Sequence, residues 1–153
     1  MPHNRRPLHE AMVLLGTKRL FQWLSLMAIS DLMRLGEAHL VSTLGRARAC
    51  QLLADRLRLN GASAFTVGVL SGVSELLCMP IAELTTQLPL TDEVATALVD
   101  GTGGLGGVLA LARDYEAGRP PETGGLPVSL QDLAGDHLAA LEWALRTYQD
   151  VLS

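Results

Sequence analysis

The sequence predicts an all-α protein, a compact helical bundle with a central buried helix over 63–77 and a long C-terminal helix over 130–152. Its 153 residues suffice for a single domain, 1–153, with a substantial core. The chain is 48% hydrophobic and only 4% aromatic, a balance that suits packed helices better than a β-sandwich. Apolar residues in its last segment recur in steps of three and four, which is a helical spacing.

The central helix is predicted from a stretch over 64–77 that is apolar on nearly every side. Such a helix belongs inside a domain, with other helices around it. Small residues within it, including Gly68, Ser71 and Gly72, would let neighbouring backbones approach closely. A buried strand is the alternative, but about 14 residues is long for a strand and ordinary for a helix.

The first half of the chain is expected to add three helices, over 8–15, from 17 onward and over 37–59. Glycines separate them, and Asn60-Gly61 is expected to end the third. Thr17 is the expected N-cap of the second helix, and Ser63 that of the central helix.

The second half is expected to hold four helices, over 80–87, 92–100, 105–117 and 130–152. Pro80 suits a first turn, Thr91 is an N-cap, and Gly118 stops the third of these helices. Ser129 with Asp132 resembles a capping box at the start of the last helix. That helix is expected to pack through an a/d-like seam of Leu138, Leu141, Leu145, Tyr148 and Leu152.

Charge and cysteine usage limit the partners. The net charge of −4 leaves no basic footprint for nucleic acid. The most membrane-like window, 20–35, is interrupted by Gln22, Asp31 and Arg34, and no signal peptide is recognisable. We therefore expect a cytoplasmic protein with no nucleic-acid and no membrane partner. Cys50 and Cys78 are expected to be buried, reduced thiols.

Two local motifs have chemical interpretations that the sequence does not favour. Residues 101–106 match G-x-G-x-x-G, which binds dinucleotides only when a strand precedes it. Because a capped helix is predicted there instead, we interpret the motif as a flexible turn between helices. Asp136-His137 is interpreted as a solvated surface pair rather than a ligand set.

Four arginines of the third helix, Arg46, Arg48, Arg56 and Arg58, have two interpretations. They form either a solvated face balanced by Asp55 and Glu37, or a basic face for nucleotide phosphates. The aromatic residues Trp23, Trp143 and Tyr148 are expected to be core or interface anchors rather than stacking platforms.

Several segments resemble the HDOD domain family, a bacterial signalling module related to HD phosphohydrolases. Residues 10–16 (EAMVLLG) resemble its "A-hydrophobic-LLG" segment, residues 51–57 (QLLADRL) its "LLA-x-x-L" helix, and residues 64–70 (AFTVGVL) its "AF-x-x-GLL" segment. The branch in which the module follows an EAL cyclic di-GMP phosphodiesterase domain is the most similar. There the likeness extends to Pro89-Leu90, residues 105–116 and residues 142–144.

The resemblance implies that the family's catalytic metal site is absent. In HD enzymes, the helix after the "GLL" segment carries the His-Asp pair that binds the metal. Here those positions are Ser71 and Gly72, and the upstream histidine ligand falls near Arg46. Hydroxyl, hydrogen and guanidinium do not replace imidazole and carboxylate around a divalent metal. We therefore expect no catalytic, cofactor-binding or metal-binding residues, no cofactor and no enzymatic activity.

The family pattern also implies helices before Leu8 for which this chain has too few residues. An apolar face left open by their loss tends to recruit a partner or a second copy, so we expect a homo-oligomer.

The function expected from this resemblance is a non-catalytic signal-transduction module that acts through protein–protein interaction, with cyclic di-GMP signalling as the candidate setting. The alternatives are a nucleotide-binding sensor and a divergent metal-dependent phosphohydrolase.

Overall fold

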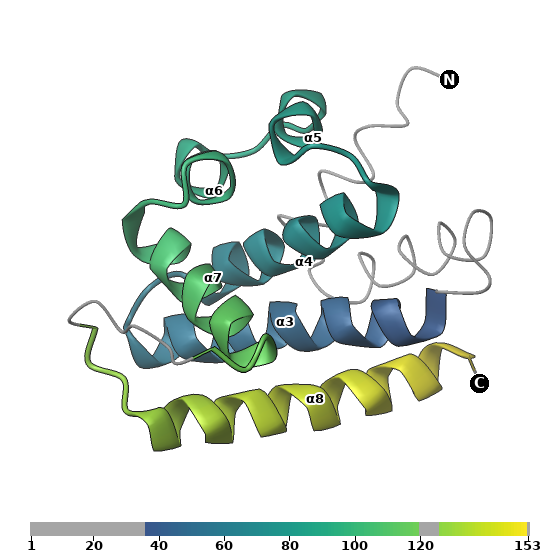
Figure 1. Cartoon of the computed structure of the whole chain (residues 1–153), viewed down its shortest axis with the longest axis vertical. Helices are drawn as coiled ribbons and strands as arrows, with labels where there is room; N and C mark the ends of the chain where they lie inside the picture. Colours follow the sequence, from purple (N-terminus) through teal and green to yellow (C-terminus); the bar gives the residue numbers. More distant parts are fainter. Residues whose placement is uncertain (1–35, 120–125, 153) are drawn as a thin grey trace.

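The computed structural model describes residues 36–119 and 126–152, and all regular structure in these ranges is helical. The helices, labelled in Figure 1, are α3 (Gly36–Arg56), α4 (Gly61–Leu77), α5 (Ile81–Gln87), α6 (Asp92–Val99), α7 (Gly103–Glu116) and α8 (Leu130–Leu152). The all-α prediction is therefore confirmed. The helices predicted over 8–15 and from 17 onward, with Trp23, lie outside the described residues.

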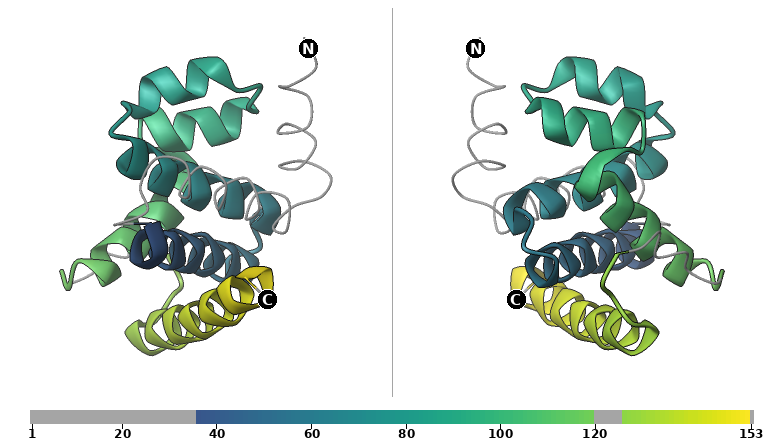
Figure 2. Two further views of the ribbon diagram at one scale, coloured as in Figure 1. Left: turned by 90° about the vertical axis from the view of Figure 1, so that its right-hand side faces the viewer. Right: turned by 90° about the vertical axis from the view of Figure 1, so that its left-hand side faces the viewer.

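Helix α4 lies at the centre of the bundle, as predicted. Its residues from Ala64 to Val73 are all buried. Helix α3 packs on one side of it, α5 and α6 lie on the other side, and α7 packs on both α3 and α4 (Figures 1 and 2). Helix α8 forms an outer layer against α3.

Glycines let α3 and α4 approach closely. A Cβ built at Gly68 would lie 2.5 Å from the Cα of Ala47 on α3, and one built at Gly72 would collide with the side chain of Thr43. Only hydrogen fits at these two positions, so the prediction of close backbone approach is confirmed. The crossing places the middle of α3 directly against α4.

Helix α8 runs antiparallel to α3 and is fixed near its start and in the middle. Arg56, at the end of α3, donates to Asp136 near the start of α8 at 2.9 and 3.0 Å. In the middle, Trp143 meets Phe65 of α4 edge to face, with ring centroids 5.9 Å apart. The guanidinium of Arg48 lies over the Trp143 ring, 5.3 Å from its centroid. Trp143 is thus the anchor that the sequence predicts.

The predicted seam of α8 is wrong for its first three leucines, whereas Tyr148 packs partly buried against the core, as predicted. Leu138, Leu141 and Leu145 are exposed. The buried side chains of this helix are instead Leu133, Ala140 and Ala144. Alanines face α3 because the two helices lie close together, as shown by the 3.9 Å between a Cβ built at Gly45 and the Cβ of Ala144.

The boundary between α3 and α4 also differs from the prediction. Helix α3 ends at Arg56 rather than at residue 59. The chain leaves the helix because Arg58 adopts a left-handed conformation (φ 62°) and the Leu59 N–H donates to the Ala54 carbonyl at 2.7 Å. Asn60 does not end α3 but caps α4, since its side chain accepts the Ser63 N–H at 3.0 Å. Ser63 is therefore inside the helix and is not its N-cap.

Other local predictions are confirmed. The Thr91 hydroxyl accepts the Val94 N–H at 3.3 Å. Ser129 and Asp132 bond reciprocally, at 3.0 and 3.3 Å, as a capping box requires. Gly118 follows α7 with φ 71°.

The glycine motif over 101–106 lies mostly within α7 rather than in a turn, because that helix begins at Gly103 and not at residue 105. The element before it is α6, a helix, so the strand on which dinucleotide binding depends does not precede it. Gly106 is required by packing, since a Cβ there would lie 2.5 Å from the carbonyl carbon of Gly101.

Within the described ranges, no single helix is long and apolar enough to cross a membrane, and two bent helix pairs, α4 with α5 and α6 with α7, pass that test by length and composition alone.

Candidate functional site

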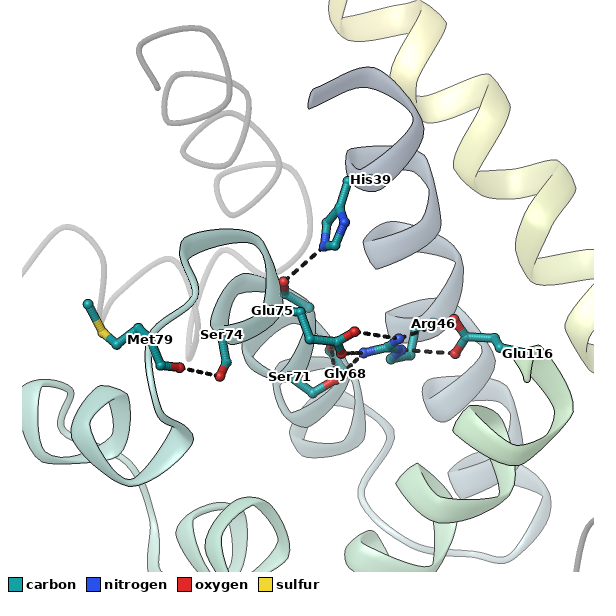
Figure 3. Close-up of polar contacts among 9 residues, drawn as sticks. His39, Arg46, Gly68, Ser71, Ser74, Glu75, Met79 and Glu116 are labelled. Atoms are coloured by element: carbon teal, nitrogen blue, oxygen red, sulfur yellow. Dashed lines mark hydrogen bonds and ion pairs between the residues drawn. The ribbon is translucent and has the colours of Figure 1, made fainter. Parts of the chain in front are cut away.

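The positions singled out by the sequence, Arg46, Ser71 and Gly72, lie at the crossing of α3 and α4. The Arg46 side chain points from α3 toward α4 and the end of α7 (Figure 3). Its Nη1 donates to Ser71 Oγ at 2.8 Å and forms an ion pair with Glu75. Its Nε donates to Glu116 Oε2 at 2.9 Å. We call Arg46, Ser71, Glu75 and Glu116 the Arg46 cluster.

All five N–H donors of the guanidinium have acceptors inside this cluster. Nε bonds to Glu116, and Nη1 bonds to Ser71 and Glu75. Nη2 bonds to Glu116 at 3.3 Å and to Glu75 at 3.5 Å. Arginine has five N–H groups and no acceptor, so the cluster leaves Arg46 no free donor for a further ligand.

Charge pairing favours the ionised forms of Arg46 and Glu75. Burial acts to lower the pKa of Arg46, but its hydrogen bonds and ion pairs with Glu75 and Glu116 outweigh burial and raise it. Burial acts to raise the pKa of Glu75, and the hydrogen bond and charge of Arg46 bring that pKa below its ordinary value. Two carboxylates facing one guanidinium leave the cluster with a net charge of about −1 at neutral pH.

Ser71 and Gly72 are both buried at this crossing. The Ser71 hydroxyl, which accepts from Arg46, donates to the Gly68 carbonyl at 3.2 Å. The Gly72 carbonyl accepts from His39 Nε2 at 3.3 Å. The three positions thus come together in space, with His39 beside them.

The residues predicted from the sequence did not include Glu75, Glu116 or His39. Glu75 carried a signal, because it is the only charged residue in the otherwise apolar α4. Glu116 carried a weaker one, since an acidic residue at the C-terminal end of a helix is opposed by the helix dipole and needs a compensating cation.

A pocket of about 190 Å³ opens beside the cluster, between α3, α7 and α8. Its lining comprises Ala38, Val41, Ser42, Gly45, Arg46, Glu116, His137 and Leu141. The His137 ring lies against Tyr115, with centroids 4.5 Å apart, and its Nδ1 is buried without a hydrogen-bond partner. Burial lowers the pKa of His137, although the charge of Glu116 acts in the other direction.

The interpretation of Asp136-His137 as a solvated pair is therefore wrong. Asp136 is bonded to Arg56, and His137 is partly buried against α7.

The arginines of α3 do not form one solvated face balanced by Asp55 and Glu37. Arg46 pairs with Glu75 and Glu116, and Arg56 pairs with Asp132 and Asp136. Arg48 donates to Gln51 at 2.7 Å as well as covering Trp143. Three of the four guanidinium groups are thus engaged by side chains of this domain, and Arg58 lies in the exposed turn after α3.

The cysteines differ from each other. Cys50 is buried, as predicted, and burial raises its pKa to about 12. Cys78 is exposed, contrary to the prediction, because it caps α4 in a left-handed conformation (φ 52°).

In the parts of the chain that the structure describes, no three histidine, cysteine or acidic side chains gather in a way that could hold a metal ion.

The fold and the cluster define an all-α domain whose central crossing is held by an arginine neutralised within the domain. The chain is similar to the uncharacterized protein YuxH of Bacillus subtilis, with 30% identity over 143 residues that cover 89% of this chain and 35% of that protein. It is also similar to the cyclic di-GMP phosphodiesterase CdgJ of Vibrio cholerae, with 31% identity over 142 residues that cover 88% of this chain and 33% of that protein.

The chain therefore spans about a third of the length of the curated relatives it matches. No family model matches the chain. No solved structure matches it.

Proposed function

We propose that this chain is a non-catalytic, HDOD-like regulatory module that acts through protein–protein contacts in cyclic di-GMP signalling. The observation that carries the proposal is the Arg46 cluster. Arg46 bonds directly to Ser71, so a fixed cation fills the place where the resemblance puts the metal of an HD enzyme.

A guanidinium at this place opposes metal binding for two reasons. Arginine stays protonated at any physiological pH, so its positive charge repels a divalent cation. The two nearest carboxylates, Glu75 and Glu116, are already used as its acceptors. A metal would have to displace a charge-assisted network whose arginine side chain is only 11% exposed.

The setting in cyclic di-GMP signalling rests on the relative from Vibrio cholerae, whose name states a cyclic di-GMP phosphodiesterase. The similarity covers only a third of that protein. We propose that its hydrolytic residues lie outside the matched third and that the matched third regulates them.

A domain replacement tests this proposal. The matched third of the Vibrio cholerae protein is replaced by residues 1–153 of this chain, and hydrolysis of cyclic di-GMP is measured with Mg²⁺ and with Mn²⁺. We expect the chimera to retain hydrolysis and the isolated chain to have none. A chimera that is folded by circular dichroism but inactive would place essential residues in the matched third and would contradict the proposal.

The phosphohydrolase alternative has its own signature in the same assay. It requires metal-dependent hydrolysis by the isolated chain that is lost in Glu116→Gln. The nucleotide-sensor alternative requires heat on mixing the isolated chain with cyclic di-GMP. The engaged side chains of Arg46, Arg48 and Arg56 weigh against the sensor, because few donors remain for a phosphate.

A further inference from the structure

The exposed side of α8 carries a row of leucines. Leu138, Leu141 and Leu145 are 67%, 41% and 46% exposed, and we call them the leucine ridge. Together they leave uncovered the equivalent of about one and a half whole leucine side chains. Single exposed leucines are ordinary on protein surfaces, but a contiguous row marks an interaction site.

The spacing of the ridge suits a second helix. Steps of three and four residues keep its leucines on one stripe, the arrangement by which paired helices interlock. Helix α8 is the outer layer of the bundle (Figure 1), and among the described helices it packs mainly on α3. The side of α8 that carries the ridge is thus left uncovered by the other described helices along much of its length.

A recess lies next to the ridge on the same face. It is the pocket between α3 and α8, and its α3 wall includes the small residues Ala38, Ser42 and Gly45. Leu141 borders the pocket and also belongs to the ridge. The ridge and the recess thus form one face, which reaches from the leucines of α8 to the small residues of α3.

The size of this face suits a weak dimer. Helix α8 has 23 residues, so it is about 35 Å long, and its outer side is about 10 Å wide. Helix α3 is mostly buried after Ser42, so only its first turns add to this area. Each copy thus offers about 450 Å², which is at the small end of specific interfaces and is typical of weak association.

Charges beside the ridge favour one orientation. Glu142 and Arg146 lie on the same flank of the leucines, one turn apart and both exposed. Neither forms an ion pair with another residue of the described ranges. When two identical helices run antiparallel, the same flanks face each other, so Glu142 of each copy approaches Arg146 of the other.

We propose that a second copy of this chain docks on the leucine ridge, with the two α8 helices antiparallel and the α3–α8 faces forming a four-helix arrangement. This interface is independent of the function proposed above, because it depends only on the exposed residues of α8 and the recess beside them.

Sedimentation velocity and light scattering on the full chain, over about 1 to 200 µM, test the interface. We expect a mass that rises toward twice 16.3 kDa. The doubly substituted chain L138E/L145E should stay monomeric over this range, because two carboxylates would be buried in an apolar contact. Val99→Glu, at an exposed valine on α6, is the matched control and should dimerise like the wild type.

A charge reversal tests the orientation without touching the leucines. Glu142→Arg alone and Arg146→Glu alone should each raise the dimer dissociation constant about 3- to 10-fold. The double reversal E142R/R146E should restore the wild-type dissociation constant, because each charged side chain would again meet the opposite charge on the other copy.

Monomer at every concentration would overturn the proposal and would assign the ridge to a different protein. A dimer unaffected by L138E/L145E, in chains shown by circular dichroism to be folded, would overturn this location. If the leucine variant does not fold, the charge-reversal variants test the interface instead. A double reversal that dimerises more weakly than either single reversal would overturn the antiparallel pairing.

Discussion

The close crossing of α3 and α4 predicts opposite effects for two glycine-to-alanine substitutions, one at the crossing and one away from it. Alanine normally stabilises a helix by about 1 kcal/mol relative to glycine. At Gly68 the added Cβ would lie 2.5 Å from the Cα and 3.0 Å from the N of Ala47. Both are backbone atoms and cannot rotate away, so α3 and α4 must move apart.

Overpacking of this kind costs about 1–3 kcal/mol, and a 2.5 Å approach to backbone belongs at the upper end of that range. After the helix-propensity gain, Gly68→Ala should lower the free energy of unfolding by about 2 kcal/mol. The melting temperature should fall by about 4–8 °C for a chain of this size.

The matched control is Gly135→Ala in α8, where a Cβ would meet nothing within 4 Å. It should raise the free energy of unfolding by up to about 1 kcal/mol. Both variants are compared with the wild type by urea and thermal unfolding, followed by circular dichroism. If Gly68→Ala proved as stable as Gly135→Ala, the close crossing of α3 and α4 would be refuted.

Three further predictions follow from the buried polar groups. Arg46→Met should lower the free energy of unfolding, measured by urea titration, by about 2–3 kcal/mol, because it leaves two carboxylates facing each other. The control Arg119→Met removes a cation from an exposed ion pair and should change the free energy of unfolding by less than about 1 kcal/mol. The pKa of His137 is lowered in the folded state, so the free energy of unfolding should fall as pH drops through about 6.5, the ordinary pKa of histidine. His137→Gln should remove this part of the dependence of the free energy of unfolding on pH between pH 7 and 5. An unchanged pH dependence would show that His137 is not desolvated. A disulfide reagent at pH 8 should titrate one thiol quickly, that of exposed Cys78, and should reach Cys50 only on unfolding; two fast thiols would contradict the burial.

Helix signals that act within four residues were predictable from the sequence. Thr91, Ser129 with Asp132, and Gly118 mark helix ends through bonds or conformations that involve only their chain neighbours. The burial of α4 was predictable for a related reason, because a helix that is apolar on nearly every side requires no choice of face.

The buried face of α8 was not predictable from the same kind of pattern. Its apolar residues cover a wide arc, and the large leucines within that arc suggested a seam. The face that packs on α3 instead uses alanines such as Ala140 and Ala144, since the helices lie too close for larger side chains. Which part of a wide apolar arc is buried depends on the partner helix, and that information is not local to α8.

The Arg46 cluster shows the same limit for polar residues. The sequence marked Arg46, Ser71 and Gly72, but it could not show that Glu75 and Glu116 supply the countercharge, because Glu116 lies 70 residues away from Arg46. The interpretation of these arginines as a solvated face was wrong for Arg46 for that reason.

The partly buried Arg46 cluster and the exposed leucine ridge have different physical roles in this fold. A guanidinium with all five donors satisfied specifies one arrangement of α3, α4 and α7, because any shift between these helices breaks charge-assisted bonds in a partly buried site. Leucines on the outer side of α8 make no such demand on the fold and are free to contact another chain. A fixed interior together with apolar side chains on the surface agrees with the proposal of a regulatory module that acts through contacts with other chains.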